Sequence, residues 1–468
     1  MIHRRVIYML GILLFMNAVS YTETVSVLIQ ADITEGDMKP LLGVNGGPYS
    51  FGEDDNPPVY EQYQDLGVNM VRTHGFQGPF DMQIIYPDST VDPSDSANFN
   101  FETTDEAFQA AHENGQEIYF RLGNSPNPAY DMSPPLNIPN YIEASKNIIR
   151  HYTEGLWDGF EYPLHYVEIW NEPLNNDFWW GTRIEFLVFY EQVAKSLKEE
   201  FPEFMIGGPA LLPVQYINQD FSEEFVEYCR TNDVPLDFLS WHMYNNDLQV
   251  FTGAMDYYRD LLDRNGFTET ESHITEWNTG SANSSRYDAQ GAAFMSAIWI
   301  NLQKKPVDLS FIHRGQDSKM NYPEFFGIMY ADGTYKKIAY AFKGWSWLMD
   351  YPIRVSSDDD ADMIETLAGL NDEMDSMGIL ISHFSQEDVE DNIEDYQLDI
   401  NGWTSPGSIN VKRYAVAKPF DLDLLNEVTY DSINALEEQL FLLPADTLEF
   451  LFITQEVISC VDEWTLLE

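Results

Sequence analysis

The sequence predicts an α/β protein, a (β/α)8 TIM barrel with a C-terminal β-sandwich domain. Short apolar segments alternate with amphipathic helical segments over residues 41–351, in eight strand–helix units. Eight units of this size favour a closed parallel barrel over an open doubly wound sheet. No glycine-rich nucleotide-binding motif follows any apolar segment, so the sequence lends no support to a dinucleotide or nucleoside triphosphate site. After residue 351, short extended runs separated by acidic loops are typical of a small β-domain.

The strands and helices of the barrel follow from the spacing of the apolar residues. In residues 182–201, for example, Leu187, Tyr190, Ala194 and Leu197 fall on one face of a helix. The predicted strands are residues 41–46, 69–74, 117–122, 165–170, 205–208, 238–244, 273–276 and 308–313. The predicted helices are residues 104–114, 138–153, 182–201, 221–231, 252–265, 289–303 and 336–349.

The N-terminus has the pattern of a secretory signal peptide, predicted as residues 1–20. Basic residues at positions 3–5 precede an apolar run over residues 6–16, and small residues stand before a cleavage site near Tyr21. This apolar run is shorter than the roughly 20 residues that a membrane-spanning helix needs. The sequence therefore predicts a secreted or periplasmic protein without membrane insertion after cleavage of the signal.

The C-terminal β-sandwich is predicted over residues 352–468. Val25, Val27 and Ile29 alternate with polar residues, which predicts that residues 21–40 contribute a strand to this domain. The acidic loops lack the ligand spacing of a calcium-binding loop and are expected to be solvated. The predicted strands of the sandwich are residues 377–383, 396–400, 408–415 and 447–453.

The composition restricts the partners and the working environment. The chain has 77 Asp and Glu against 25 Lys and Arg, a formal net charge of −52. Such a surface argues against nucleic acid and anionic membranes as partners, and it suits high salt, where self-repulsion is screened. Cys229 and Cys460 are far apart, so neither a disulfide framework nor a cysteine-rich zinc site is implied. The composition does not indicate the oligomeric state.

Two glutamates stand where the active site of a barrel is expected. Glu172 ends the fourth predicted strand and Glu276 ends the seventh. Active sites of TIM barrels lie at the carboxyl ends of the strands, and glycoside hydrolysis requires two carboxyl groups on either side of the sugar. A purely structural strand end and a non-catalytic carbohydrate-binding barrel are the alternatives.

Around these glutamates the chain resembles glycoside hydrolase family 39 of clan A, which includes β-xylosidases and α-L-iduronidases. The similarity runs over residues 69–278, whereas the end of the barrel and the sandwich are similar only in general character. The stretches that carry it are VRTHG at 71–75, YVEIWNEP at 166–173, IGGPA at 206–210, VPLDFLSWHMY at 234–244 and HITEWNT at 273–279.

The resemblance implies a role for each matching residue. It makes Glu172 the general acid/base and Glu276 the nucleophile of a retaining mechanism that needs no metal and no organic cofactor. Trp179, with its neighbour Trp180, is either a stacking platform for sugar or part of the packing of the loop. The remaining residues expected to bind substrate or line its site are Arg72, His74, Asn171, His242, Tyr244 and Trp277. For His242 the alternative is a core histidine, and for Arg72 it is a structural ion pair.

The eighth predicted strand departs from the family. Where the β-xylosidases carry an aromatic segment containing Trp, this chain has His313 and Arg314. Since Arg binds carboxylate and sulfate groups, these residues suggest a substrate with an anionic or otherwise modified sugar. The alternative is that Arg314 pairs with Asp317 or with another loop carboxylate of this acidic protein.

The expected function is thus that of a secreted retaining glycoside hydrolase. The preferred version is exo-acting on an oligosaccharide, and the other is endo-acting on a polysaccharide.

Overall fold

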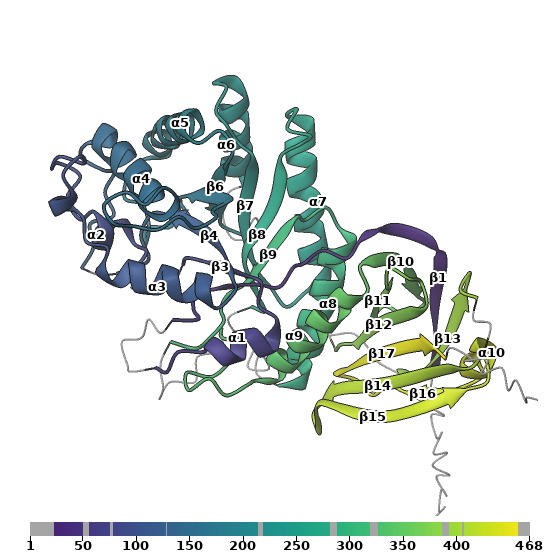
Figure 1. Cartoon of the computed structure of the whole chain (residues 1–468). Helices are drawn as coiled ribbons and strands as arrows, with labels where there is room; N and C mark the ends of the chain where they lie inside the picture. The colour runs from purple at the N-terminus through teal and green to yellow at the C-terminus, as the bar shows by residue number, and fades with distance from the viewer. Residues whose placement is uncertain are drawn as a thin grey trace, which may run out of the picture.

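The computed structural model describes residues 23–49, 56–74, 78–127, 129–213, 219–280, 288–318, 326–385, 393–404 and 407–456. The expected signal peptide and Cys460 lie outside these residues. The predicted fold class is confirmed: eight parallel strands form a closed barrel, and a second sheet packs beside it (Figure 1). In the described part of the chain, no helix is both long and apolar enough to cross a membrane.

The barrel strands occur where the apolar segments predicted them, and sequential neighbours pair in parallel around the ring. The interior of the barrel is packed rather than open, because it is filled by a cluster of buried side chains: Met70, Tyr119, Phe238 and Phe311. The strands are β2 (Gly43–Asn45), β3 (Met70–Arg72), β4 (Glu117–Leu122), β5 (Tyr166–Ile169), β6 (Met205–Leu211), β7 (Phe238–Tyr244), β8 (Glu271–Asn278) and β9 (Leu309–Ile312).

The helices surround the barrel, and local signals fix several of their ends. Thr182 and Glu185 form a capping box at the start of α5. The sequence prediction missed α1, which has only seven residues and follows β2. The helices of this part are α1 (Tyr60–Leu66), α2 (Met82–Ile85), α3 (Glu102–Glu113), α4 (Ile138–Thr153), α5 (Arg183–Glu200), α6 (Gln219–Thr231), α7 (Leu248–Arg264), α8 (Ala289–Lys304) and α9 (Lys337–Trp347).

The second domain is one continuous sheet of nine strands in the order β15-β14-β17-β12-β11-β10-β1-β13-β16. Strand β1 pairs antiparallel with β10 and parallel with β13, so the sheet is mixed. The sheet curls around its own apolar core. Its strands are β1 (Glu23–Asp37), β10 (Ile353–Asp359), β11 (Ile364–Leu370), β12 (Ser376–His383), β13 (Ile393–Asn401), β14 (Ile409–Ala417), β15 (Phe420–Tyr430), β16 (Phe441–Leu442) and β17 (Thr447–Gln455), with the short helix α10 (Ile433–Glu437).

Helix α8 joins the two domains. Residues 289–303 carry buried side chains except at Gln290, because the helix lies between the barrel and the second sheet (Figure 1). Its sequence is accordingly apolar on nearly all sides. Ser382 of β12 donates a hydrogen bond of 2.7 Å to the carbonyl oxygen of Ala293, and Leu380 and Phe450 pack into the same core as the barrel helices. The sheet therefore supports the α8 side of the barrel.

Candidate active site

Glu172 and Glu276 meet at the carboxyl end of the barrel. Glu172 follows β5, the fourth barrel strand, and Glu276 lies near the end of β8, the seventh. One carboxylate oxygen of Glu172, one of Glu276 and a ring nitrogen of His242, from β7, all lie within 4.8 Å of one another. Paired carboxyl groups about 5–5.5 Å apart suit retaining glycoside hydrolysis, whereas inversion needs about 6.5–9.5 Å. One oxygen of each glutamate lies within 4.8 Å of one oxygen of the other, which agrees with the shorter of these two separations.

A β-bulge in β8 turns Glu276 into the barrel. Trp241 of β7 is opposite Ile274, but the next residue of β7, His242, is opposite Glu276, so β8 has one additional residue, Thr275. Without this bulge, simple alternation would place Thr275 opposite His242 and direct Glu276 toward the helices. The bulge therefore allows Glu276 and His242 to face the same cleft.

Glu172 is held by an unusual backbone and by two polar neighbours. Its φ of 44° lies in the left-handed region, as does the φ of 77° at Trp170. Such conformations cost free energy in non-glycine residues and are often found at functional sites. The Glu172 amide donates to the carbonyl oxygen of Ala210. Asn175 Nδ2 donates to its Oε2 at 2.8 Å, and His242 Nδ1 lies 2.8 Å from its Oε1.

Glu276 lies in a more positive environment. Arg72 Nη1 donates to its Oε1 at 2.8 Å, and the Tyr244 hydroxyl donates to its Oε2 at 2.6 Å. Burial by itself would raise the pKa of Glu276. This effect is outweighed by the positive charge of the neighbouring side chains, so the pKa of Glu276 lies well below its usual range; these neighbours are His242, His313, His74 and Arg72. Burial lowers the pKa of His74 strongly and that of His313 to about 4, so both rings are neutral at neutral pH. At neutral pH, the ionised form of Glu276 is therefore stabilised mainly by the permanent charge of Arg72 and by the hydrogen bond from Tyr244.

Arg72 connects several polar residues beneath the cleft. Its Nε and Nη2 both lie 2.7 Å from Glu168 Oε2, and its other hydrogen bonds reach Asn45 Oδ1 and Asn171 Oδ1. The side chain is fully buried. Arg72 was expected to bind substrate or line its site, and the structure places its buried side chain beneath the cleft, where it positions Glu276 and Asn171.

The structure brings most of the other predicted residues to the cleft. His74 Nε2 and His313 Nδ1 lie 3.4 and 3.6 Å from oxygens of Glu276. Asn171 Nδ2 and His74 Nδ1 are buried and have no hydrogen-bond partner within the described chain. Both atoms are therefore well suited to receive hydroxyl groups of a sugar.

Two predicted residues do not reach the cleft. Trp277 is fully buried on the outer side of β8, where it packs edge-to-face with Phe251 of α7, because adjacent strand residues point to opposite faces. Trp179 is buried against Trp170 and does not form a stacking platform. Its neighbour Trp180 is the exposed one of the pair, at 58%.

The sequence analysis missed several residues that shape the site. Asn45 and Glu168 hold Arg72, and Asn175 holds Glu172. Phe178 packs near His74, and Phe326 lies edge-on to Tyr244 and His313. Inward alternation along β5 could have indicated Glu168, but the positions of the loop residues depend on the fold.

Arg314 and Asp317, which follow His313 after β9, are both buried. Asp317 forms a buried ion pair of 2.7 Å with Lys336, and its other oxygen accepts the amide hydrogen of Gly327. Arg314 is itself only 7% exposed, and its charge contributes to the lowered pKa of His313.

The group formed by Glu172, His242 and Glu276 also has the donor atoms that a divalent cation prefers, within 4.8 Å of one another. Among the described residues, no other group of three His, Cys, Asp or Glu side chains has its ligand atoms this close together. The same atoms are those that a two-carboxylate hydrolase uses, so cation binding would compete with the sugar.

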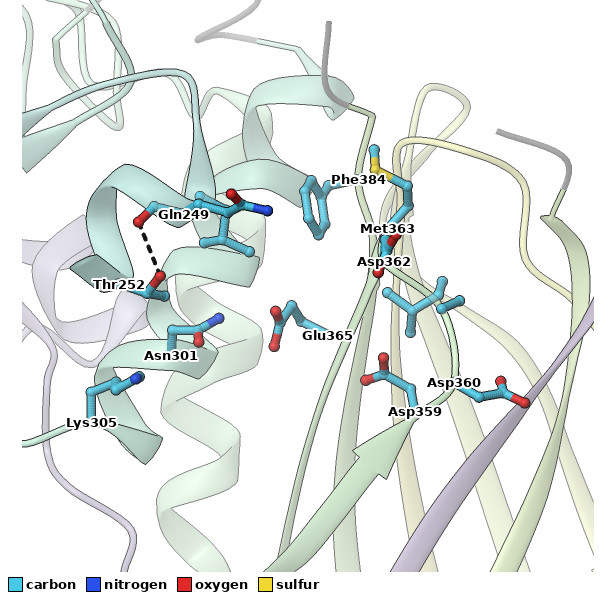
Figure 2. Close-up of a pocket in the computed structure, with 13 residues that line it drawn as sticks. Gln249, Thr252, Asn301, Lys305, Asp359, Asp360, Asp362, Met363, Glu365 and Phe384 are labelled. Atoms are coloured by element: carbon cyan, nitrogen blue, oxygen red, sulfur yellow. Dashed lines mark hydrogen bonds between the residues drawn. The ribbon is translucent and has the colours of Figure 1, made fainter. Parts of the chain in front are cut away.

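A hollow also lies away from these glutamates, between the barrel and the second sheet. Its volume is about 550 Å³, and Asn301 and Lys305 at the end of α8 face Asp359 and Glu365 of the β10–β11 hairpin (Figure 2). Burial and the charge of Glu365 raise the pKa of Asp359 to about 7. The lining of this hollow does not include the two strand-end glutamates of the cleft.

Comparison with known proteins agrees with the geometry. The family model described as "Glycosyl hydrolases family 39" matches residues 54–419. A β-xylosidase of Caldicellulosiruptor saccharolyticus is 24% identical over 342 residues, which are 66% of this chain and 68% of that protein. A glucosidase structure from Croceicoccus marinus has a TM-score of 0.79 at 24% identity, with 92% of this chain and 99% of that chain covered. A GH39 enzyme structure from Xanthomonas axonopodis pv. citri has a TM-score of 0.74 at 14% identity, with 94% and 99% covered.

Proposed function

The chain belongs to glycoside hydrolase family 39 and is a glycoside hydrolase, and from this premise we propose that Glu276 is its nucleophile and Glu172 its general acid/base. In the first step Glu276 attacks the anomeric carbon, while Glu172 gives its proton to the leaving oxygen. In the second step Glu172 removes a proton from water, which attacks the same carbon and releases Glu276. The anomeric configuration is retained because two inversions follow each other.

The contrast between the two carboxyl groups is the observation that supports this assignment. Glu276 accepts hydrogen bonds from a buried guanidinium and a tyrosine hydroxyl, which favour an ionised nucleophile. Glu172 has Asn175 and His242 as its neighbours and no arginine within hydrogen-bond distance in the described chain. Glu172 therefore has no hydrogen-bonded arginine of the kind that favours the ionised form of Glu276.

We propose that Asn171, His74 and His313 contact the sugar directly. Asn171 Nδ2 and His74 Nδ1 are buried polar atoms next to the nucleophile, and each gains a partner if a sugar hydroxyl occupies the cleft. His313 approaches Glu276 from β9, the last strand of the barrel. In this arrangement His242 and Tyr244 orient the carboxyl groups from β7.

We further propose exo action on an oligosaccharide whose terminal sugar carries an anionic or otherwise modified group. The support is the presence of His313 and Arg314 in place of an aromatic segment, since Arg binds carboxylate and sulfate groups. We also propose that residues 1–20 are a cleaved signal peptide and that the enzyme is secreted. Mass spectrometry of the mature N-terminus tests the second proposal.

Azide rescue tests the catalytic assignment. With an aryl glycoside, Glu276→Gly should lose activity, and azide should restore turnover to a glycosyl azide of the opposite anomeric configuration. Glu172→Gly with azide should give a glycosyl azide of unchanged configuration. Hydrolysis by the wild type with inversion would contradict the double displacement.

A substrate panel tests the choice of sugar and the mode of action. Aryl xylosides, glucosides and glycuronides are compared, together with a polysaccharide. Preferred cleavage of glycuronides supports the anionic sugar, and preferred cleavage of unmodified xylosides or glucosides contradicts it. Release of long fragments from the polysaccharide would indicate endo action instead.

A further inference from the structure

A second pocket lies on the same end of the barrel as the catalytic glutamates. Its volume is about 170 Å³, and it is formed by α2, the loop that follows β4, the first turns of α4, and Trp170 after β5. Trp170 precedes Glu172 by two residues, so the two backbones lie within about 7 Å of each other. The pocket therefore adjoins the catalytic loop without containing either glutamate.

Two buried donors in its wall have no partner. Tyr141, on α4, is 5% exposed, and Trp170 is 2% exposed, and both line the pocket. Within the described chain, neither the Tyr141 hydroxyl nor Trp170 Nε1 makes a hydrogen bond. Buried polar groups are usually satisfied, so these donors call for acceptor oxygens supplied from within the pocket.

The walls are fixed by hydrogen bonds between loops. Gln83 donates from its amide to Asn124 Oδ1 at 3.0 Å and from Nε2 to the carbonyl oxygen of Asp131 at 2.6 Å. These bonds join α2 to the loop after β4. The pocket is therefore formed before a ligand enters, which lowers the entropic cost of binding.

The charge and shape of the lining restrict the ligand. Its charged side chains are Asp88 and Asp131, and local hydrogen bonds lower the pKa of both carboxyl groups, so both are ionised at neutral pH. No Lys or Arg belongs to the described lining. Leu136, 87% exposed, and three prolines provide an apolar side. An anionic ligand is disfavoured, while a neutral ring with hydroxyl groups meets both the donors and the apolar side.

We propose that this pocket is a second carbohydrate subsite, which binds a neutral sugar unit of the oligosaccharide beyond the unit that is cleaved. Hydroxyl oxygens of that unit accept hydrogen bonds from Tyr141 and Trp170. The identity of the ligand as a carbohydrate rests on the proposed function. Binding energy at such a remote unit raises the efficiency of cleavage for longer substrates.

Direct binding tests the subsite in the full chain carrying Glu276→Gln, which prevents turnover. The indole N–H resonance of Trp170 is followed by NMR during titration with xylohexaose, cellohexaose and mannohexaose, and with trigalacturonate as the anionic control. At least one neutral hexasaccharide should shift this resonance saturably, and trigalacturonate should not. No saturable shift with any neutral hexasaccharide, or an equal shift with trigalacturonate, would overturn the proposal, leaving the pocket as a site for water only.

Tyr141→Phe and Tyr190→Phe form a matched pair for kinetics and binding. Tyr190 also has a buried hydroxyl without a partner in the described chain, but it does not line the pocket. Tyr141→Phe should weaken binding of the responding hexasaccharide roughly 3- to 10-fold and leave kcat/KM for the aryl monoglycoside unchanged. Tyr190→Phe should change neither. An equal loss on both substrates, or no loss on the oligosaccharide, counts against the subsite.

These results separate the subsite from the proposed function. Failure of azide rescue contradicts the catalytic assignment, but the Trp170 titration still tests sugar binding in the pocket, because it does not depend on turnover. Successful rescue with an unresponsive Trp170 resonance contradicts the subsite alone.

Discussion

Arg72 donates a hydrogen bond from Nη1 to Oε1 of Glu276 at 2.8 Å, and no part of its side chain is exposed. A buried guanidinium keeps its charge, because burial cannot readily deprotonate it. The carboxylate beside it is therefore stabilised in the ionised form that a nucleophile requires. The same guanidinium also binds Glu168, so the two carboxylates share one cation.

Arg72→Lys should impair both catalysis and stability. An ammonium group lacks the planar fork that reaches Glu168, Glu276 and Asn171 together, so we expect kcat to fall about 100-fold. The unfolding free energy should fall by about 3 kcal/mol, because a buried carboxylate loses its partner. Steady-state kinetics and urea unfolding measure the two effects.

Arg264→Lys is the matched control for this change, since Arg264 is exposed and pairs with Glu223 on the surface. It should alter stability by less than about 0.5 kcal/mol. Equal effects of the two substitutions would contradict the role given to Arg72.

Tyr244→Phe should shift the pH dependence of activity. The substitution removes the hydrogen bond of 2.6 Å to Glu276 Oε2 and keeps the ring. Because this bond favours the carboxylate, its loss raises the pKa of Glu276, and the acidic limb of kcat/KM moves to higher pH. We expect kcat/KM at the optimum to fall about 10-fold or more. An unchanged acidic limb in the pH profile would show that this hydrogen bond does not tune the nucleophile.

Trp179 and Trp180 should respond differently to alanine. Trp179 is buried against Trp170 and Phe186, so Trp179→Ala should lower the unfolding free energy by about 3–5 kcal/mol. Trp180 is 58% exposed, and Trp180→Ala should cost about 1 kcal/mol or less. Thermal and urea unfolding of the two variants provide the comparison, and similar losses would mean that the burial of Trp179 does not support the loop.

Asp359→Asn should stabilise the protein at neutral and alkaline pH. Burial, followed by the charge of Glu365, raises the pKa of Asp359 to about 7, whereas an unfolded aspartate has a pKa near 3.9. The folded state therefore binds the proton more tightly, and the unfolding free energy of the wild type falls as the pH rises from about 4 to about 7. Asparagine removes this loss, so the variant should gain roughly 1–3 kcal/mol over the wild type at pH 8 and much less at pH 4.

Urea unfolding across this pH range measures the difference. Asp360→Asn, an exposed neighbour in the same hollow, is the control and should show no such pH dependence. A gain that is the same at every pH would contradict the linkage.

Salt should stabilise the fold. With a formal net charge of −52, the native state repels itself, and the Debye length shortens from about 10 Å at 0.1 M to about 3 Å at 1 M. We expect the melting temperature to rise with sodium chloride over this range, and to rise less in sucrose of equal osmolality. A melting temperature that is independent of salt would remove the argument for saline conditions.

The sequence predicted the barrel well because each strand there is buried on both faces. Apolar runs such as residues 238–244 and 117–122 match β7 and β4 in both bounds. The strands of the second sheet were harder to predict from the sequence. Strand β15 carries exposed acidic residues at Asp421 and Asp423, and β10 runs into the acidic segment that was assigned to a loop. On an exposed face charged residues are tolerated in strands, so composition alone does not separate strand from loop.

The site was predicted in part for a similar reason. Glu172 and Glu276 stand at strand ends, and in a parallel barrel every strand end faces the same cleft. The sequence could not tell which neighbours point inward, because the bulge at Thr275 and the left-handed backbone at Glu172 break simple alternation. Trp277 was consequently assigned to the cleft although it packs into the helix layer, and for Trp179, which the sequence left open between stacking on sugar and packing of the loop, the buried position agrees with packing.

By itself, the sequence determined the fold class, the pair of glutamates and the family resemblance, because these depend on residue type and on periodicity along the chain. Only the tertiary structure decided how the pair is held: Arg72 beneath Glu276, Asn175 beside Glu172, and His242 between the two. It also decided that Tyr141 and Trp170 share one pocket. These contacts join residues of different strands and loops, and their distances are set by closure of the barrel rather than by spacing in the sequence.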